Sequence, residues 1–352
     1  MKHYPKLFTP GKIANLIVKN RIVMTAMGTC LAAVDGQPSP EIIKYYEARA
    51  KGGVGLIITE ITRIDEVEGK GISHQLGVTE MKHIAALQRL TDAIHSYGTK
   101  IFIQLHHPGK EGIPQLTNGP LVAPSAIPGS KGNMPRELST EEVQGLVKKF
   151  ITGAVIARAG GADGVEVHAA HGYLINQFLS PRHNHRTDQY GGSFENRLRF
   201  AVEIVSGIRQ ACPGFPISVR ISADEFMPDG NNLEAGVKIA QAMVAAGADV
   251  INVSNGLHES GVTIMEPYAY PEGWKKVSAT SWVPVEACWP ILNGPTRQSR
   301  ASPKPSATVL AVCSVSPSWA PAATLAAPQT PVPAVNCTSE RPLQMPPDVR
   351  RL

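Results

Sequence analysis

Apolar runs alternate with amphipathic runs along residues 1–276, and this alternation constrains the fold more than any other feature of the chain. Six short, β-branched runs predict strands, at Arg21–Met27, Val54–Glu60, Lys100–Leu105, Gly164–His168, Ile217–Ile221 and Asp249–Ser254. The stretches between them predict helices, at Ser39–Lys51, Met81–Tyr97, Ser139–Ala159, Asn196–Ala211 and Leu233–Ala246. A strand–helix unit that recurs about every 40 residues is typical of a parallel sheet.

Two parallel architectures compete for this pattern. A doubly wound sheet usually has a glycine-rich phosphate-binding loop after its first strand, whereas the first strand here leads into Ala26-Met27-Gly28-Thr29-Cys30. A (β/α)8 barrel, which typically has about 250 residues, fits better. We therefore predict an α/β fold of the (β/α)8 TIM-barrel type, of which about six strand–helix units are recognisable.

The helix ends carry two kinds of signal. Ser139 or Thr140, just before a helical stretch, is expected to accept hydrogen bonds from the first free N–H groups of that helix. Gly98, Gly160 and Gly247 each follow a helical stretch, where a left-handed closing residue is expected.

The composition changes abruptly near Val277. The last 76 residues hold 13 of the 29 prolines but only 1 of the 32 glycines, and they contain no histidine, tyrosine or phenylalanine. No strand–helix alternation is visible there, and the composition is typical of a disordered tail or a shifted reading frame. We predict a barrel domain over residues 1–276, incomplete at six units, and a proline-rich tail of low structure over residues 277–352.

Charge and cysteine usage exclude several classes of protein. The predicted barrel carries 28 Lys and Arg against 26 Asp and Glu, without a basic stripe, so we expect no nucleic-acid partner. No signal peptide and no membrane-spanning run is visible, which predicts a soluble, cytoplasmic protein with no membrane partner. We expect no metal site and no disulfide, because the cysteines are far apart, at Cys30, Cys212, Cys288, Cys313 and Cys337.

Three polar side chains lie at or just after the end of the fourth predicted strand: His168, His171 and Tyr173. Active sites of parallel α/β folds gather at the carboxyl ends of strands. Two imidazoles can stabilise a carbonyl oxygen that gains negative charge, and a phenol can donate a proton, which suits hydride addition to a C=C bond conjugated to a carbonyl. A metal pair is an alternative, although His-x-x-His at a strand end lacks the helical spacing of a zinc protease, and ordinary structural histidines are another.

Longer motifs around this segment resemble the Old Yellow Enzyme family of flavin-dependent ene-reductases. The similar stretches run from about residue 5 to 276 and include residues 7–11, 16–24, 168–200 and Gln104-Leu105-His106-His107-Pro108-Gly109-Lys110. The last of these matches the family's Gln-Leu-x-His-x-Gly-Arg signature, with Lys110 in place of Arg. Residues 253–259 are most similar to the long-chain branch, which includes dienoyl-CoA reductases, 2-enoate reductases, bacterial NADH oxidases and bile-acid enone enzymes.

The resemblance implies an FMN-binding barrel. Backbone groups at the end of the first strand would line the flavin, and two further residues would approach its pyrimidine edge; these residues are Thr25, Ala26, Met27, Ile61 and Gln104. Ala26 replaces the more usual proline. Arg220 would face the flavin N1/C2 carbonyl region, where reduction deposits negative charge. A surface ion pair is the alternative for Arg220, but the residue lies inside a predicted strand.

The resemblance also assigns the chemistry. Tyr173 would be the proton donor, assisted by His258, which could equally be an ordinary loop residue. His168 and His171 would face the substrate carbonyl. His107 matches the family motif, whereas a structural role is expected for His106. NADH or NADPH would supply electrons, and the acceptor would be a small enoyl or enone compound or oxygen. The sequence does not predict the oligomeric state.

The resemblance fails beyond residue 276. The family holds the FMN phosphate in loops after strands seven and eight, and nothing in residues 277–352 matches them. Long-branch relatives continue into an iron–sulfur site and an FAD-binding domain, which this chain does not support. One interpretation is a flavin reductase whose reading frame is lost near Val277. A second interpretation is an inactive six-strand fragment whose first and sixth strands are unpaired. A third is a non-redox barrel enzyme, a lyase or isomerase that uses Glu60 and Asp224.

Overall fold

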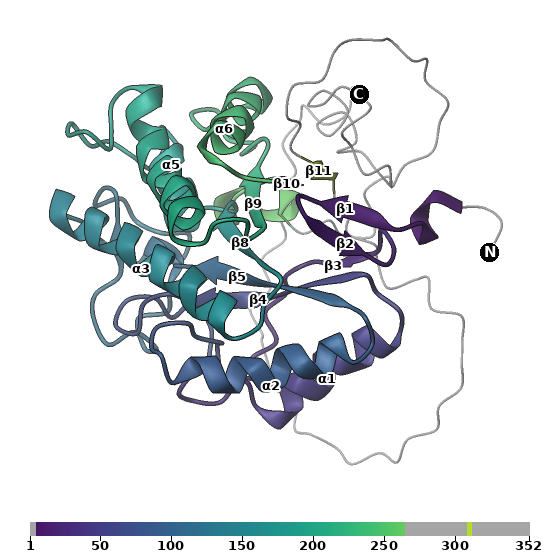
Figure 1. Cartoon of the computed structure of the whole chain (residues 1–352). Coiled ribbons are helices and arrows are strands. Elements are labelled where there is room, and N and C mark those ends of the chain that lie inside the picture. Colours follow the sequence, from purple (N-terminus) through teal and green to yellow (C-terminus); the bar gives the residue numbers. More distant parts are fainter. Residues whose placement is uncertain (1–4, 265–307, 312–352) are drawn as a thin grey trace, which may run out of the picture. The chain divides into compact units, whose positions relative to one another are not determined.

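Seven parallel strands form one sheet. The computed structural model describes residues 5–264 and 308–311, all within the unit of the chain that runs from Met1 to Cys313. The strands are β3 (Val23–Met24), β4 (Leu56–Arg63), β5 (Lys100–His106), β8 (Gly164–Ala169), β9 (Ile217–Ser222), β10 (Val250–Ser254) and β11 (Thr308–Ala311). Their order is β11-β10-β9-β8-β5-β4-β3, and every neighbouring pair is parallel. The prediction of a parallel sheet is confirmed (Figure 1).

Long helices lie along the outer side of this sheet (Figure 1). They are α1 (Pro40–Lys51), α2 (His83–His95), α3 (Thr140–Ala159), α5 (Phe194–Ala211) and α6 (Leu233–Ala246), and each overlaps a predicted helix. Helix α3 begins with a capping box: Ser139 Oγ accepts the Glu142 N–H at 3.2 Å, and the Glu142 carboxylate accepts the Ser139 N–H at 2.7 Å. Ser139, rather than Thr140, is therefore the cap.

Shorter elements surround the two ends of the sheet. Near the amino terminus, η1 (Pro5–Phe8) precedes an antiparallel hairpin of β1 (Gly11–Ile13) and β2 (Leu16–Val18). The loops that follow the strands contain η2 (Gly109–Glu111), β6 (Val122–Ala123), β7 (Arg136–Glu137), α4 (Leu174–Leu179) and η3 (His258–Thr263). Helix α4 begins directly after Tyr173 and was not predicted.

Three details of the sequence analysis are wrong. Strand β3 covers only Val23–Met24, so residues 25–27 belong to the following loop. Gly160 has a right-handed φ of −79°, and Gly161, with φ +84°, is the left-handed residue after α3. Strand β11 pairs with β10, so the sixth predicted strand is not the unpaired edge expected of a six-strand fragment. The remainder of residues 277–352 lies outside the described residues.

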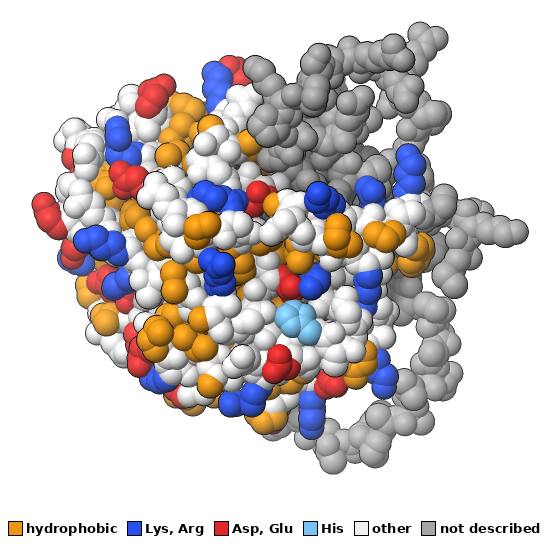
Figure 2. Space-filling view, in the orientation of Figure 1, with side chains coloured by type: hydrophobic (Ala, Val, Ile, Leu, Met, Phe, Trp, Pro, Cys, Tyr) orange, Lys and Arg blue, Asp and Glu red, His pale blue; other side chains and the backbone are white. Residues whose placement is uncertain are grey.

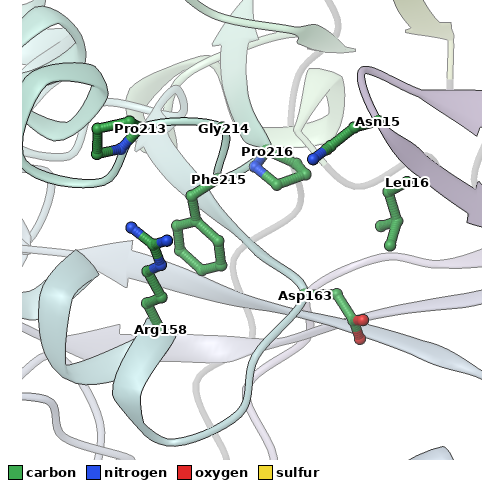
Figure 3. Close-up of a pocket in the computed structure, with 8 residues that line it drawn as sticks. All are labelled: Asn15, Leu16, Arg158, Asp163, Pro213, Gly214, Phe215 and Pro216. Carbon is green, nitrogen blue, oxygen red and sulfur yellow. The ribbon is translucent and has the colours of Figure 1, made fainter.

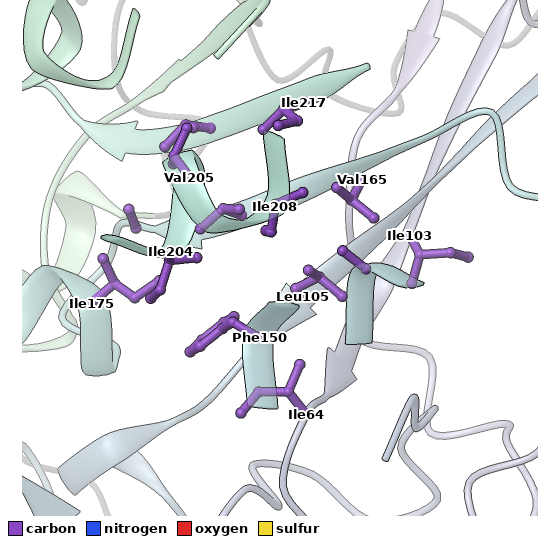
Figure 4. Close-up of a cluster of buried hydrophobic side chains, with 14 of the residues drawn as sticks. Ile64, Ile103, Leu105, Phe150, Val165, Ile175, Ile204, Val205, Ile208 and Ile217 are labelled. Carbon is purple, nitrogen blue, oxygen red and sulfur yellow. The ribbon is translucent and has the colours of Figure 1, made fainter. Parts of the chain in front are cut away.

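Two hydrophobic clusters hold the described part together. The larger one fills the space between the sheet and the helices, with Ile103, Val165 and Ile217 from the strands meeting Phe150 of α3 and Ile204 of α5 (Figure 4). The smaller one lies on the other side of the sheet, near the amino ends of the strands. There the hairpin packs on strand residues, and the cluster contains Ile13, Val18, Leu56, Ile58, Phe102 and Val250. The inner side of the sheet is thus apolar only at its amino end.

Candidate active site

Polar side chains replace the apolar ones on the inner side of the sheet toward the carboxyl ends of its strands. Gln104, Glu166 and Ser218 lie side by side on β5, β8 and β9 because the strands pair in that register. Two residues further along, His168 of β8 pairs with Arg220 of β9, which pairs with Asn252 of β10. Since side chains two residues apart share a face, these polar groups form two adjacent rows. We call these six residues, with His106 at the end of β5, the polar rows.

Glu166 is the centre of the first row. One of its oxygens accepts a hydrogen bond from Gln104 Nε2 at 2.8 Å. The other accepts hydrogen bonds from Ser218 Oγ at 2.8 Å and from Asn252 Nδ2 at 2.9 Å. Glu166, Gln104 and Asn252 are fully buried. These contacts fix both amide groups, so each amide turns its nitrogen to the carboxylate and its oxygen away from it.

Several atoms of the polar rows are shielded from solvent but lack a hydrogen-bond partner among the described residues. They are Gln104 Oε1, Asn252 Oδ1, Arg220 Nε and both ring nitrogens of His106. A buried polar group without a partner costs about 1–3 kcal/mol, so such a concentration indicates the place of a ligand. The set offers acceptors beside a donor. A flavin pyrimidine ring presents one N–H between two carbonyl groups, and the residues therefore fit FMN.

The other residues assigned to the flavin lie at the same end of the sheet. Ile61 of β4 is paired in register with Gln104. Thr25, Ala26 and Met27 follow β3, and the Met27 side chain is 59% exposed. Glu60 anchors this loop, since its carboxylate accepts the backbone N–H and the hydroxyl of Thr29, both at 2.6 Å. Glu60 therefore has a structural task in this loop.

Tyr173 lies at the centre of a group of imidazole rings. Its ring centroid is 4.4 Å from that of His106, 4.8 Å from that of His258 and 5.0 Å from that of His168. The rings of His168 and His171 are 5.1 Å apart. The structure thus brings together the four residues to which the resemblance assigns chemistry, and adds His106, for which a structural role was expected.

An unusual turn after β8 aims these side chains. His171 and Gly172 both have left-handed backbone angles, with φ of +66° and +82°. The His171 N–H donates to Ser222 Oγ at 2.9 Å, and His171 Nε2 lies 2.6 Å from Ser254 Oγ. A left-handed non-glycine residue is strained, and such strain persists where surrounding contacts maintain it.

Hydrogen bonds indicate where the ring protons lie. His168 Nδ1 accepts the Ala170 N–H at 3.3 Å, which leaves the proton of the neutral ring on Nε2. His258 Nδ1 donates to the His171 carbonyl at 2.7 Å, because a carbonyl oxygen can only accept. His258 is half-buried, unlike His106, and lines a cavity of about 670 Å³ that also contains Arg182 and Glu259. His258 thus lies between the ring of Tyr173 and this cavity.

Burial sets the protonation states in this group. Burial, helped by the neighbouring charges of His171 and His106, holds the pKa of His168 well below its usual 6.5, so its ring is neutral at physiological pH. Burial, with a smaller contribution from Glu111, raises the pKa of Tyr173 to about 12. Tyr173 is therefore protonated and can donate. Burial likewise lowers the pKa of Arg220, and the Glu166 carboxylate counteracts that change.

A salt-bridge cluster supports the loop that carries His258. Glu259 accepts hydrogen bonds from Lys110 Nζ at 3.1 Å and from Arg182 Nε at 2.7 Å, and His183 Nε2 lies 3.1 Å from the same carboxylate. Lys110 also donates to the Pro128 carbonyl at 3.1 Å. The cluster thus joins the loops that follow β5, β8 and β10, and Lys110 links the first of these to the third.

A group of possible metal ligands lies elsewhere, in Asp65, Glu68 and His107. Lys149 Nζ lies 2.5 Å from Asp65 Oδ2, and an Arg136 nitrogen lies 3.3 Å from Glu68 Oε1. The two carboxylates are already neutralised, so this group gives no reason to assign a metal.

Two surface features bear on other functions. A cavity of about 290 Å³ lies at the amino ends of the strands, away from Tyr173, and is lined by Asn15, Leu16, Arg158, Asp163, Pro213, Gly214, Phe215 and Pro216 (Figure 3). Figure 2 shows acidic and basic side chains interspersed on the face in view. Among the described residues, no helix has the length and apolar character needed to cross a bilayer.

The fold and the site together define a parallel α/β-barrel protein with a ligand site at the carboxyl ends of its strands. A family model described as NADH:flavin oxidoreductase / NADH oxidase matches residues 6–287, and the chain belongs to this family. The match extends beyond residue 276, where the sequence analysis ended the barrel domain.

Curated relatives agree with this assignment. The chain is 49% identical over 278 residues to an NADH oxidase of Thermoanaerobacter brockii, covering 78% of this chain and 43% of the relative. It is 41% identical over 259 residues to an NADPH dehydrogenase of Halalkalibacterium halodurans, covering 73% and 74%. A cinnamate reductase of Clostridium sporogenes is 40% identical over 280 residues, covering 73% and 42%. The chain thus spans less than half the length of two of these relatives.

Solved structures agree on the fold. A 2-naphthoyl-CoA reductase in complex with 2-naphthoyl-CoA superposes with a TM-score of 0.76 at 32% identity, over 79% of this chain and 44% of that one. An Old Yellow Enzyme homologue from Zymomonas mobilis superposes with a TM-score of 0.65 at 30% identity, over 71% and 74%. These neighbours confirm the predicted TIM-barrel fold and the resemblance to the Old Yellow Enzyme family.

Proposed function

We propose that this protein is an FMN-dependent oxidoreductase that passes hydride from NADH or NADPH to a small compound with a C=C bond conjugated to a carbonyl group. One observation carries the proposal: buried polar atoms without partners among the described residues lie beside a neutral imidazole and a protonated phenol. Relatives named NADH oxidase, NADPH dehydrogenase and cinnamate reductase support it. Oxygen is the alternative acceptor, in keeping with the name of the first of these.

FMN, when bound, supplies the ability to accept a hydride from a nicotinamide and to pass it to a second compound. Gln104 Oε1 would accept a hydrogen bond from the flavin, and the Arg220 guanidinium would stabilise negative charge at the N1/C2 region. Thr25, Ala26 and Met27 would contact the flavin through the loop after β3. Ile61, beside Gln104 on β4, would pack against the pyrimidine edge.

The imidazole–phenol group would perform the acid chemistry. His168, with its proton on Nε2, and His171 would donate hydrogen bonds to the substrate carbonyl oxygen and stabilise the negative charge that develops there. Tyr173 would donate a proton to the carbon next to that carbonyl. His258, which is half-buried beside the cavity, would return a proton to Tyr173 from solvent.

Location and partners follow the same proposal. The only partners proposed are the nicotinamide donor and a small acceptor, with neither nucleic acid nor membrane involved. We place the protein in the cytoplasm, as its sequence predicts.

Replacing Tyr173 by Phe tests the proposal. Flavin reduction by NADH or NADPH should keep its rate, because the phenol takes no part in it. Reoxidation by 2-cyclohexenone should slow by about 10²-fold or more, since a general acid typically contributes 10²–10⁴-fold. Stopped-flow absorbance of the flavin measures the two half-reactions separately.

Tyr97→Phe is the matched control, because its hydroxyl donates to Glu47 and the residue lies in the loop after α2 rather than in the site. It should change neither half-reaction. An equal loss in both half-reactions of Tyr173→Phe would show that the proton-donor role is wrong.

A further inference from the structure

Glu166 is a fully buried carboxylate for which the proposed chemistry has no use. It lies in the middle of the polar rows and holds three side chains from three different strands. Two of these, Gln104 and Asn252, have buried amide oxygens with no partner in the described part of the chain. The sequence analysis placed Glu166 inside a buried strand and assigned it no role.

The carboxylate determines which way the two amides face. An ionised carboxylate can only accept hydrogen bonds, so each amide must present its NH2 group to Glu166. The amide oxygens, Gln104 Oε1 and Asn252 Oδ1, are thereby turned away from the carboxylate and remain without a partner among the described residues. A neutral amide at position 166 both donates and accepts, and it would allow either neighbour to rotate and present an NH2 group there instead.

The negative charge of Glu166 also lies close to the positive charge of Arg220. His168 is two residues beyond Glu166 on β8 and is paired with Arg220 on β9, so the carboxylate and the guanidinium lie in adjacent rows. The electrostatic influence of Glu166 favours the charged form of Arg220. A negative charge so close to the site disfavours negative charge on a bound ligand, whereas the positive charge of Arg220 favours it.

We propose that Glu166 is a positioning residue that orients the Gln104 and Asn252 oxygens toward the flavin. Its charge also makes bound flavin harder to reduce than it would be if Arg220 were present without Glu166. This inference rests on the proposed function, since it requires a flavin in the site. A carboxylate with a purely structural role would affect the stability of the fold and leave the flavin potential unmoved.

The test uses the full-length chain with FMN as the probe. Binding is measured by quenching of FMN fluorescence, and the midpoint potential of bound FMN by dye-coupled reductive titration. Glu166→Gln should raise the Kd for FMN about tenfold, the effect of losing a hydrogen bond that involves a charged group. It should also shift the midpoint potential to more positive values, because the charge opposing reduction is gone.

A further variant separates orientation from charge, and a second one is its control. Glu166→Asp keeps the charge but is too short to hold both amides, so it should weaken FMN binding while the potential stays nearer the original value than in Glu166→Gln. Thr91→Ala is the matched control, since it removes a buried hydroxyl that bonds to the Gly160 carbonyl at 2.9 Å on α2, outside the polar rows, so both quantities should stay close to those of the original chain.

If Glu166→Gln does not fold, Asn252→Ala replaces it and should weaken FMN binding by removing one oriented oxygen. An unchanged Kd and potential in Glu166→Gln, or an unchanged Kd in both Glu166→Asp and Asn252→Ala, would overturn the inference. Failure of the original chain to bind FMN would overturn the proposed function as well, so the two failures are distinguishable.

Discussion

His106 and His83 are both fully buried histidines, but their ring nitrogens are in opposite situations. His83 Nδ1 accepts the Glu80 N–H at 3.2 Å, and Nε2 donates to the Asp35 carbonyl oxygen at 3.1 Å. Neither nitrogen of His106 has a partner within the described residues. A buried histidine whose ring nitrogens lack partners destabilises the ligand-free protein, and a ligand that bonds to those nitrogens can offset the loss of stability.

Replacing each of these histidines by leucine should therefore have opposite effects. His106→Leu should raise the free energy of unfolding of the FMN-free protein by about 1 kcal/mol, because two unsatisfied polar atoms are removed. His83→Leu, the matched control, should lower it by a similar amount because two bonded partners lose theirs. Urea unfolding measures both. Destabilisation of similar size in both variants would show that His106 is satisfied in solution.

At the scale of elements, four strands share a pattern in which apolar and polar residues alternate. It reads Ile103-Gln104-Leu105-His106, Val165-Glu166-Val167-His168, Ile217-Ser218-Val219-Arg220 and Ile251-Asn252-Val253-Ser254. The apolar members face the helices and the polar members face inward. A polar inner side at the carboxyl ends of parallel strands is what a ligand site in such a fold requires.

Helix α3 offers a direct test at this scale. Ser139→Ala should lower the free energy of unfolding by about 1 kcal/mol, because the capping box loses the hydroxyl that satisfies a free N–H group. Ser96→Ala is the matched control, since its hydroxyl bonds only to the Ala93 carbonyl at an exposed position. Chemical denaturation compares them, and equal effects would mean that the box contributes nothing.

The alternation also explains which parts could be predicted. The strands and helices were predictable because each buries one face, and the carboxyl-end position of Tyr173 followed from them. Glu166 and Asn252 were missed because their strands were treated as uniformly buried, although the alternating pattern is visible in the sequence. The partners of Glu166 depend on strand register, which a single sequence does not reveal. The β11 strand was missed because proline-rich surroundings hid a four-residue run.

For the whole molecule, buried histidines link stability to pH. Burial lowers the pKa of His107 from 6.5 to about 4, and it holds the pKa values of His106 and His168 well below 6.5. Below pH 6.5 the unfolded chain binds protons that the folded chain does not. Above pH 6.5 the neutral buried histidines therefore make their full contribution to the free energy of unfolding. This contribution is lost as the pH falls toward 4, by up to about 1.4 kcal/mol per pH unit for each histidine.

His107→Gln should make the loss of stability between pH 6.5 and pH 4 shallower. The matched control is His185→Gln, which changes an exposed histidine and should leave the slope as it is. Thermal unfolding followed by circular dichroism across this range measures the slopes. A steeper loss in His107→Gln, or the same change in both variants, would contradict the linkage.

The central claim is that the polar rows at the carboxyl ends of β5, β8, β9 and β10 hold a flavin. Calorimetric titration of FMN into the full-length chain and into Arg220→Met tests it most directly. We expect one FMN per chain and binding at least about tenfold weaker in Arg220→Met, because the guanidinium is lost from the site. Absence of binding to the original chain, or equal affinity in a folded Arg220→Met variant, would contradict it.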